Sequence, residues 1–469
     1  MTIKVSQNPY VLLINPPFQR LLYAERPYIP YGLLYIATFL QKNGIKSKVY
    51  NADLRTNNTV NQEGGRIWKE IEHVVKREKP DVVGIGVLTP QYASALKVAS
   101  IVKNFDGDIP VIFGGVHSTF MADEVALGEN VDIVVRGEGE ETTLDIVKTL
   151  MTGESLKNVS GITYRKNKEI VRNPDRPLIK NLDILPFPDR ELLINKRFYP
   201  HSEFGVITPS RGCPYRCTFC SSNAFWGYRT RSAENIVDEI EYLKDRYHLL
   251  DFWLEGDSFL IIRKHVLQLC KELKARKLRI MWGAMARVDQ IDKELIKEMK
   301  SSGFCNISLG CESGSQKILD AINKGVTVEQ IRNAVRLLKK EGIFVNTYWM
   351  VGYQEETVET IKETKNLMKE LKPNLIRTFI MTPFPGSAEY RKAKAFGRLL
   401  SNDWSDYHVS NPHLLKRPYI DNKVIEQEYK EFLKMEERET SAWFLYLMSH
   451  PKLLLMKTFE TLYQFRGDV

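Results

Sequence analysis

The sequence has 469 residues, too many for one ordinary hydrophobic core, so its length predicts two or three domains. Its composition, 43% hydrophobic and 27% charged, is typical of a globular protein that folds in water, and it holds no run of about twenty apolar residues that would span a membrane. The net charge of +9 is spread along the chain without a basic block, so we expect a solvated surface and no nucleic-acid partner.

The first ten residues lack the apolar core and cleavage site of a secretory signal, which predicts a cytoplasmic protein. All six cysteines lie at or after Cys213, and this usage fits a reduced compartment better than a disulfide framework. Cys270, Cys305 and Cys311 fall in apolar stretches, where a buried thiol without a functional role is expected.

Residues 1–150 alternate short apolar runs, typical of strands, with helical periods. The predicted strands are 10–15, 47–51, 82–87, 111–114 and 133–136. The predicted helices are 32–43, 65–76, 92–104 and 142–152. Five strands joined by crossover helices form a parallel sheet, so we expect a Rossmann-like α/β domain here.

Ligands of such sheets bind at the carboxyl ends of the strands. Those ends are rich in small, polar or turn-forming residues, and glycines among them allow a ligand to approach the backbone closely. The candidate ligand-binding residues at this edge are Asn15, Asp53, Thr89, Gln91, Gly114, Gly115, His117, Gly137 and Glu138.

Residues 151–200 are rich in charge and proline, which predicts a linker, and the β/α alternation resumes at Phe204. The predicted strands are 204–208, 251–255, 280–286, 305–310, 343–351 and 375–381, separated by helices such as 233–247, 328–340 and 356–371. Six βα units predict an open, partial (β/α)6 barrel over 201–387. Residues 388–469 are expected to form a helical C-terminal extension, whose apolar helix over 443–465 more often caps a core than touches a membrane.

Cys213, Cys217 and Cys220 follow the first strand of this second region. Three thiolates at this spacing can bind three irons of a four-iron cluster and leave the fourth iron open to another ligand. A structural zinc site normally closes with a fourth ligand, and no second pair of cysteines or histidines follows soon after Cys220. The pattern favours the cluster, with a non-enzymatic zinc or nucleic-acid binding protein as the remote alternative.

The same three cysteines, with Phe219 directly before the third, resemble the signature of the radical S-adenosylmethionine (SAM) enzymes. The resemblance implies that SAM binds the open iron, and that residues after successive barrel strands contact SAM. The residues it singles out are Glu255 and Asp257 after the second strand, Arg287 after the third, Glu312 and Ser313 after the fourth, Gly352 after the fifth and Pro385 after the sixth.

The loops of the first domain resemble the cobalamin-binding domain found ahead of the core in cobalamin-dependent radical SAM enzymes. The Asp-x-His-x-x-Gly motif of another cobalamin-domain type is absent, so the resemblance implies cobalamin without a histidine ligand. His117 is expected to donate or accept hydrogen bonds rather than bind the metal. Tyr23, Tyr28 and Tyr92 are further candidates to line the cofactor.

The resemblance implies a 4Fe-4S cluster that cleaves SAM to a 5′-deoxyadenosyl radical with an electron from a donor such as flavodoxin or ferredoxin. We expect methylation of an unactivated carbon or phosphorus centre, with cobalamin carrying the methyl group. Ring formation, rearrangement or oxidation without methyl transfer uses the same domains and stays open. The substrate class, a small molecule, a peptide or a lipid, is also open.

Overall fold

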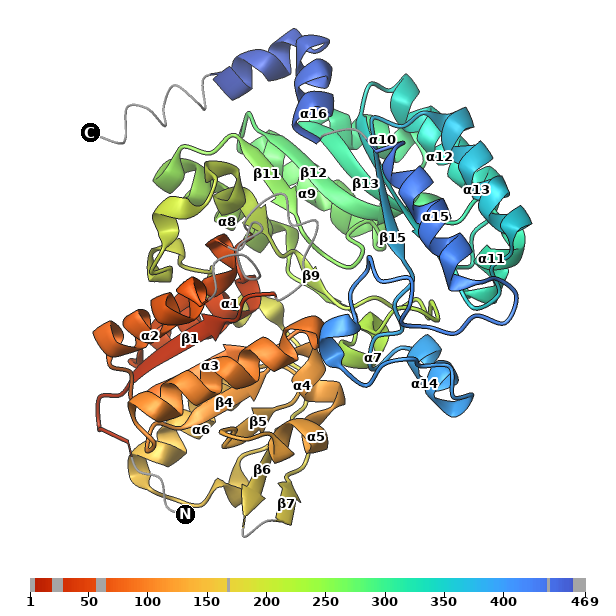
Figure 1. Cartoon of the computed structure of the whole chain (residues 1–469). Coiled ribbons are helices and arrows are strands. Elements are labelled where there is room, and N and C mark those ends of the chain that lie inside the picture. Colours follow the sequence, from red (N-terminus) through yellow and green to blue (C-terminus); the bar gives the residue numbers. More distant parts are fainter. Residues whose placement is uncertain (1–4, 19–27, 56–64, 167–168, 437–438, 459–469) are drawn as a thin grey trace. The chain divides into compact units, whose positions relative to one another are not determined.

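The computed structural model describes residues 5–18, 28–55, 65–166, 169–436 and 439–458, and the chain divides into two compact units (Figure 1). The first unit comprises Met1–Lys180, Ile184–Glu203 and Ser401–His408. The second comprises Asn181–Asp183, Phe204–Leu400 and Val409–Val469. Each unit contains a sheet of its own, so the α/β organisation predicted from the sequence is confirmed.

The first unit contains a seven-stranded sheet in the order β2-β1-β3-β4-β5-β6-β7. Its strands are β1 (Tyr10–Asn15), β2 (Lys46–Asn51), β3 (Val82–Gly86), β4 (Val111–Gly114), β5 (Ile133–Val135), β6 (Ile162–Lys166) and β7 (Glu169–Arg172). The first five are parallel, as predicted, and β6 and β7 are antiparallel. Strands β6 and β7 come from the segment predicted as a linker, whose charged residues obscure the alternation of a two-stranded hairpin.

Helices connect the parallel strands of the first unit. They are α1 (Tyr31–Lys42), α2 (Arg66–Glu78), α3 (Tyr92–Phe105), α4 (Val116–Phe120), α5 (Ala122–Leu127) and α6 (Glu140–Thr152). The sequence pattern predicted no helix between β4 and β5. The structure has two short ones there, α4 and α5.

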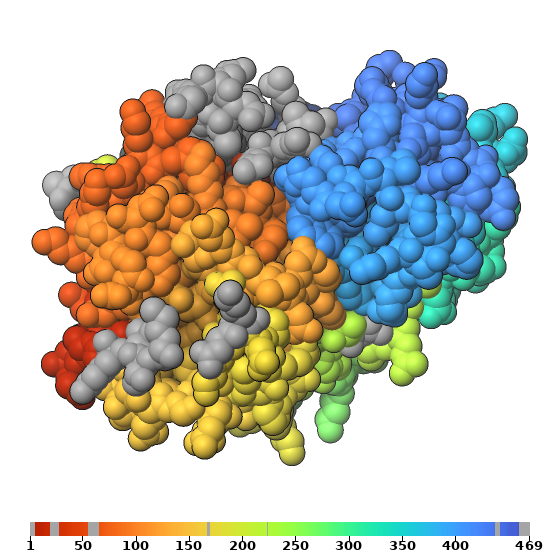
Figure 2. Space-filling view, turned by 60° about the horizontal axis from the view of Figure 1, so that its bottom comes forward, coloured from red at the N-terminus to blue at the C-terminus, as the bar shows by residue number. Residues whose placement is uncertain are grey.

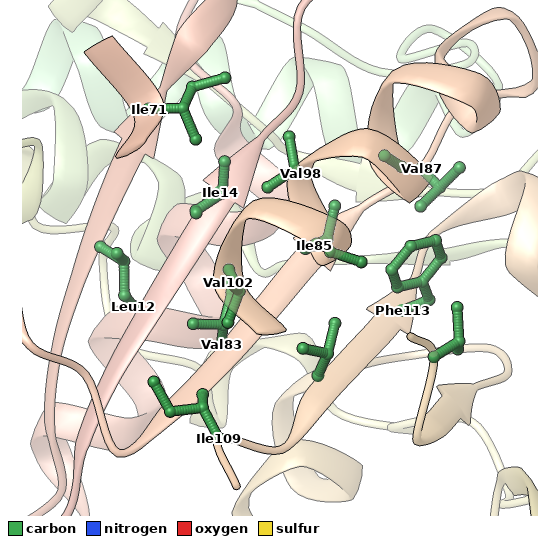
Figure 3. Packing of buried hydrophobic residues seen from close by; sticks show 14 of the residues in the cluster. Leu12, Ile14, Ile71, Val83, Ile85, Val87, Val98, Val102, Ile109 and Phe113 are labelled. Carbon is green, nitrogen blue, oxygen red and sulfur yellow. The ribbon is translucent and has the colours of Figure 1, made fainter. Parts of the chain in front are cut away.

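One hydrophobic cluster of the first unit lies between the sheet and these helices. Figure 3 shows Ile14 and Ile85 from the sheet beside Val98 from α3. A fully buried aliphatic side chain stabilises the fold by about 1.5–3 kcal/mol. This packing fixes the carboxyl ends of β1, β3 and β4 on one edge.

The second unit contains six parallel strands in the order β15-β14-β13-β12-β11-β8. They are β8 (Val206–Ile207), β11 (Asp251–Leu254), β12 (Met281–Arg287), β13 (Phe304–Glu312), β14 (Phe344–Val351) and β15 (Leu375–Ile380). The connecting helices are α8 (Ala233–Tyr247), α9 (Arg263–Ala275), α10 (Lys293–Ser301), α11 (Gln316–Ala321), α12 (Val328–Lys340) and α13 (Val358–Leu371). Neighbours in the sheet are neighbours in the chain, which is the organisation of a partial TIM-type barrel, and the strand carboxyl ends share one edge.

The C-terminal extension contains α14 (Ala388–Ala395), α15 (Asn422–Leu433) and α16 (Glu439–Met448). In α16, Tyr446 donates a hydrogen bond to the carbonyl oxygen of Gly342 at 2.9 Å and packs with Phe344. The described part of the predicted apolar helix therefore caps the core of the second unit. No described helix combines the length and apolar character needed to cross a bilayer.

Candidate functional site

The three cysteines lie in one loop of the second unit, between β9 (Ser210–Arg211) and α7 (Ser222–Phe225). The loop begins at Gly212, whose φ is +80°. A Cβ atom there would lie 2.7 Å from the Cβ of Trp226 and 2.9 Å from the carbonyl oxygen of Gly227. Only glycine meets both requirements, so its backbone sets the path of the chain into the cysteines.

Burial raises the pKa of all three thiols, that of Cys220 to about 11. Two cations act against burial at Cys217, because Lys324 and Arg287 lower the pKa of its thiol. Iron binding requires the thiolate form, and nearby positive charge stabilises that form. Among the described residues, no three His, Cys, Asp or Glu side chains are grouped around a point that would suit one metal ion.

Arg287, at the end of β12, faces the cysteine loop. Its Nη1 lies 3.9 Å from the Cys217 sulfur, and its guanidinium lies 3.6 Å from the centre of the Tyr215 ring. Asp289 pairs with its Nε at 3.0 Å. The side chain is almost fully buried, so these contacts hold a positive charge beside the thiols.

Glu312, at the end of β13, forms a buried ion pair with Lys324 at 2.7 Å. Its backbone φ of +63° is unusual for a residue other than glycine, and such strain persists only where the surroundings enforce it. The sequence did not identify Lys324, although a lysine beside a turn glycine, Gly325, offered a weak signal. Glu312, at the end of β13, and Lys324, after α11, both lie close enough to Cys217 to affect the pKa of its thiol.

Glu255 and Asp257 follow β11 and are exposed. Partial desolvation raises the pKa of Glu255, and Asp257 raises it further. Asp257 also acts on the thiols of Cys213 and Cys220. The structure therefore places the Asp257 carboxyl close enough to act on the cysteine loop, and contact between either carboxyl and SAM stays a prediction.

The loop after β14 is held by a buried carboxylate. Glu356 accepts a hydrogen bond from the amide of Gly352 at 3.0 Å, and burial raises its pKa to about 7. Arg417, from the C-terminal extension, donates to the carbonyl oxygen of Gly352 at 2.6 Å. Gly352 has a φ of +90°, and a Cβ atom there would lie 2.8 Å from the Arg417 guanidinium. Arg417 was not identified from the sequence.

The other predicted SAM residues of the second unit have internal contacts. The Ser313 hydroxyl pairs with the Thr364 hydroxyl at 3.1 Å and accepts from the amide of Ser315, so it shapes its own turn. Phe219 is half-buried and packs edge-on against Tyr353 at 6.3 Å. Pro385 is buried in the turn after β15. Contact between any of these residues and SAM stays a prediction.

In the first unit, several predicted residues hold the carboxyl-end loops together. Asn15 donates to the Asn51 side chain at 2.8 Å, and Asp53 accepts from the amide of Phe18 at 3.1 Å. The buried Gln91 donates to the carbonyl oxygen of Pro16 at 2.7 Å, which ties the loop after β3 to the loop after β1. These polar side chains are bonded within the protein, so they build the edge on which a ligand would rest.

His117 is fully buried on α4. Its Nδ1 lies 3.3 Å from the Thr89 hydroxyl, and its ring packs between Tyr92 and Trp404 at 4.9 and 5.0 Å. Burial lowers its pKa to about 3, so the ring is neutral at ordinary pH. Its Nε2 has no hydrogen-bond partner, and neither have the buried hydroxyls of Ser94 and Ser118.

The remaining predicted residues of this edge are three glycines and an acid. Gly114 ends β4, and Gly115 has a φ of +99° with Val87 backbone atoms within about 3 Å of where a Cβ would stand, so it allows close packing between strands. Gly137 has a φ of +75° and faces open space. The Glu138 carboxylate accepts from the amide of Ile179 at 2.6 Å, so it is an internal tie.

Both units fit the groups implied by the sequence. In the second unit, Lys324, Arg287 and the exposed Asp257 all act on the thiols of the cysteine loop. In the first unit, three unpartnered buried polar atoms lie in the helices that begin at the strand ends, as a polar ligand requires. Tyr23 lies outside the described residues, and Tyr28 is held by hydrogen bonding to Asn15.

Two family models match the chain. The Radical SAM superfamily model matches residues 207–368, which include all three cysteines, and the B12 binding domain model matches residues 21–147. The two matches fall in the second and first units respectively.

Relatives match the chain over almost its whole length. It is 30% identical to an uncharacterized methyltransferase of Pyrococcus horikoshii, over 96% of this chain and 95% of that protein. It is also 30% identical to the anaerobic magnesium-protoporphyrin IX monomethyl ester cyclase of Rubrivivax gelatinosus, over 94% of this chain and 81% of that one.

A solved structure shares the fold. The radical S-adenosylmethionine methyltransferase TsrM from Kitasatospora setae, with cobalamin and an iron-sulfur cluster bound, superposes with a TM-score of 0.74 at 17% identity, covering 92% of this chain and 91% of that one.

Proposed function

Because this chain belongs to the cobalamin-dependent radical SAM enzymes, we propose that it transfers a methyl group to an unactivated carbon or phosphorus centre of its substrate. The cofactors of this family are a 4Fe-4S cluster, SAM and cobalamin. The observation that carries the proposal is the 30% identity to a methyltransferase over 96% of the chain, because it spans both units.

When bound, the cluster and SAM supply a 5′-deoxyadenosyl radical, and cobalamin supplies the methyl group. Cys213, Cys217 and Cys220 each bind one iron. Arg287 and Lys324 place positive charge beside Cys217, which offsets the negative charge of the thiolates.

Other residues of the barrel edge would hold SAM. Glu255 and Asp257 would accept hydrogen bonds from its amino group, and the loop that begins at Gly352 would lie beside its adenine. In the first unit, Thr89, His117 and Gly137 would line the cobalamin site. His117 stays neutral there and acts as a hydrogen-bonding residue, in keeping with its low pKa.

A second candidate function is ring formation without methyl transfer. The 30% identity to a cyclase over 94% of this chain favours it, and the same cofactors would be needed. The two candidates differ in what happens to SAM. Methyl transfer consumes two SAM and two electrons for each methyl group delivered, and yields S-adenosylhomocysteine, 5′-deoxyadenosine and methionine. Ring formation does not produce S-adenosylhomocysteine.

The test is anaerobic reconstitution with iron, sulfide and cobalamin, followed by SAM and a low-potential chemical reductant. We expect the absorbance and paramagnetic resonance of a reduced four-iron cluster, with 5′-deoxyadenosine formed. S-adenosylhomocysteine should form only until each cobalamin carries a methyl group, because the mixture contains no methyl acceptor. The Cys217→Ala variant should form no 5′-deoxyadenosine. Formation of 5′-deoxyadenosine alone would contradict methyl transfer and favour the cyclase type of reaction, and a colourless zinc protein that leaves SAM intact would contradict both.

We further propose a cytoplasmic enzyme that takes its electrons from a flavodoxin or ferredoxin. All six cysteines are free thiols, which accords with a reduced compartment. A small-molecule substrate accords with the magnesium-protoporphyrin IX monomethyl ester cyclase that the chain resembles, and a peptide or a lipid remains an alternative.

A further inference from the structure

A buried carboxylate from the C-terminal extension joins two loops of the second unit. Glu389, in the first turn of α14, is 3% exposed. One of its oxygens accepts from the hydroxyl of Thr218 at 2.9 Å, and the other accepts from the side-chain amide of Gln354 at 2.5 Å. Thr218 lies between Cys217 and Phe219, and Gln354 lies in the loop that begins at Gly352. The carboxylate is therefore a direct bridge between the cysteine loop and the loop after β14.

The bridge is reinforced on both sides. The backbone amide of Glu389 donates to the carbonyl oxygen of Thr218 at 3.0 Å, and the amide of Thr218 donates to the carbonyl oxygen of Ile322 at 2.9 Å. Arg398 donates to the oxygen of the Gln354 side chain at 2.6 Å. This bond orients the Gln354 amide so that its nitrogen faces Glu389. Each of these hydrogen bonds around Glu389 joins a donor to an acceptor.

A carboxylate in this place is costly for a purely structural role. An unpaired buried charge destabilises a protein by several kcal/mol, and an apolar side chain of similar size would fill the same space without that cost. The charge is retained with both oxygens bonded, one to each loop. Hydrogen bonds to a charged group are about twice as strong as neutral ones, which suits a joint that must hold two loops in register.

We propose that Glu389 is a positioning residue for SAM cleavage, holding the cysteine loop and the loop after β14 at a fixed separation through Thr218 and Gln354. The inference rests on the proposed function, because it needs the cysteines to bind the cluster and the Gly352 loop to bind SAM. Small displacements of reacting groups are expensive, and a shift of about 1 Å can cost roughly a hundredfold in rate.

The test compares four variants in the full-length, reconstituted protein. Glu389→Met removes both bonds and keeps the volume. Thr218→Val and Gln354→Leu each remove one bond. Glu389→Gln keeps both, because its carbonyl can accept from Gln354 while its amide donates to the Thr218 hydroxyl. Thr347→Val, which removes a buried hydroxyl from the middle of β14, is the matched control.

We expect Glu389→Met to keep its iron content, to bind SAM at least about tenfold more weakly, and to lose most of the SAM-induced change in the cluster's paramagnetic resonance spectrum. Thr218→Val and Gln354→Leu should give intermediate losses that are not additive with Glu389→Met, because the three residues form one unit. Glu389→Gln keeps both bonds in a weaker, neutral form, so it should be clearly less impaired than Glu389→Met.

The inference is wrong if Glu389→Met, or both single-bond variants where Glu389→Met does not fold, match Thr347→Val in SAM affinity and in the spectrum with SAM. It is also wrong if Glu389→Gln is as impaired as Glu389→Met, since a loss of charge alone would then explain the effect. A wild-type protein that binds no cluster or does not cleave SAM would overturn the proposed function instead, and the two failures are distinguishable.

Discussion

At the scale of single residues, burial decides the state of the groups that the sequence could only name. His117 was a loop histidine in the sequence, and in the structure it is a neutral ring packed against Tyr92 and Trp404. Cys270, Cys305 and Cys311 are buried thiols, as their apolar surroundings predicted. Lys324 shows the reverse, because only the fold brings its charge to Glu312 and Cys217.

Because His117 is buried and neutral, we expect the stability of the first unit to decrease at acidic pH. Its pKa in the folded protein is about 3, below the ordinary value of 6.5, because burial disfavours the charged ring. Between pH 6.5 and pH 3 the imidazole is protonated in the unfolded chain and neutral in the folded chain. The free energy of unfolding therefore decreases as the pH falls from 6.5 towards 3, by about 1.4 kcal/mol per pH unit. Urea unfolding followed from pH 7 to pH 4 should show a shallower loss in His117→Gln. The exposed His73→Gln is the control and should keep the wild-type slope.

At the scale of elements, contacts from other segments of the chain fix the position of each loop. The cysteine loop starts at Gly212, where neighbouring atoms of Trp226 and Gly227 leave no space for a side chain. The loop after β14 is fixed by Glu356 from inside and Arg417 from the extension. Segments that follow the barrel, 388–395 and 412–422, thus shape loops within it.

Gly212→Ala should impair the cluster. The added methyl group would overlap Trp226, so the loop must move and the three thiols with it. We expect iron bound per chain after reconstitution to fall by at least about half, given the strict geometry of iron-thiolate ligation. Gly397→Ala is the matched control, because Gly397 also has a positive φ, +60°, but faces open space. Equal iron content in both variants would show that the Gly212 backbone is not needed for ligation.

At the scale of the whole molecule, the chain carries two ligand-binding units, each with its own sheet and core. In the space-filling view of Figure 2 the first unit is coloured mainly orange and yellow, and the C-terminal part of the second unit is blue. The segment 401–408 belongs to the first unit although the chain on either side of it belongs to the second, and Trp404 from this segment contacts His117.

Hydrogen exchange should locate the two ligands in different units. Hydroxocobalamin should protect amides in the loops after β1, β3, β4 and β5, and in 401–408, because ligands bind where parallel strands end. SAM, added to the reconstituted protein, should protect the cysteine loop and the loops after β13, β14 and β15. Protection by cobalamin confined to the second unit would contradict the assignment of the first unit as the cobalamin domain.

The sequence by itself determined the class of chemistry and most of the strands. Ligand spacing in Cys213, Cys217 and Cys220 is local, and the apolar runs of parallel strands are visible wherever both faces of the sheet are buried. The hairpin β6 and β7 escaped because a charged edge hairpin carries little apolar pattern. The candidate residues of the first unit do lie at the carboxyl ends of its strands. The sequence could not show that several of these side chains form hydrogen bonds within the protein.

Only the tertiary structure decided how the cysteine loop is held. Thr218, Gln354 and Glu389 are separated by up to 171 positions in the chain, yet they form one hydrogen-bonded bridge. Arg287 and Lys324 reach Cys217 from the ends of different elements. Long-range polar pairs leave no periodic trace in a sequence, because each partner satisfies the other only after the barrel has closed around them.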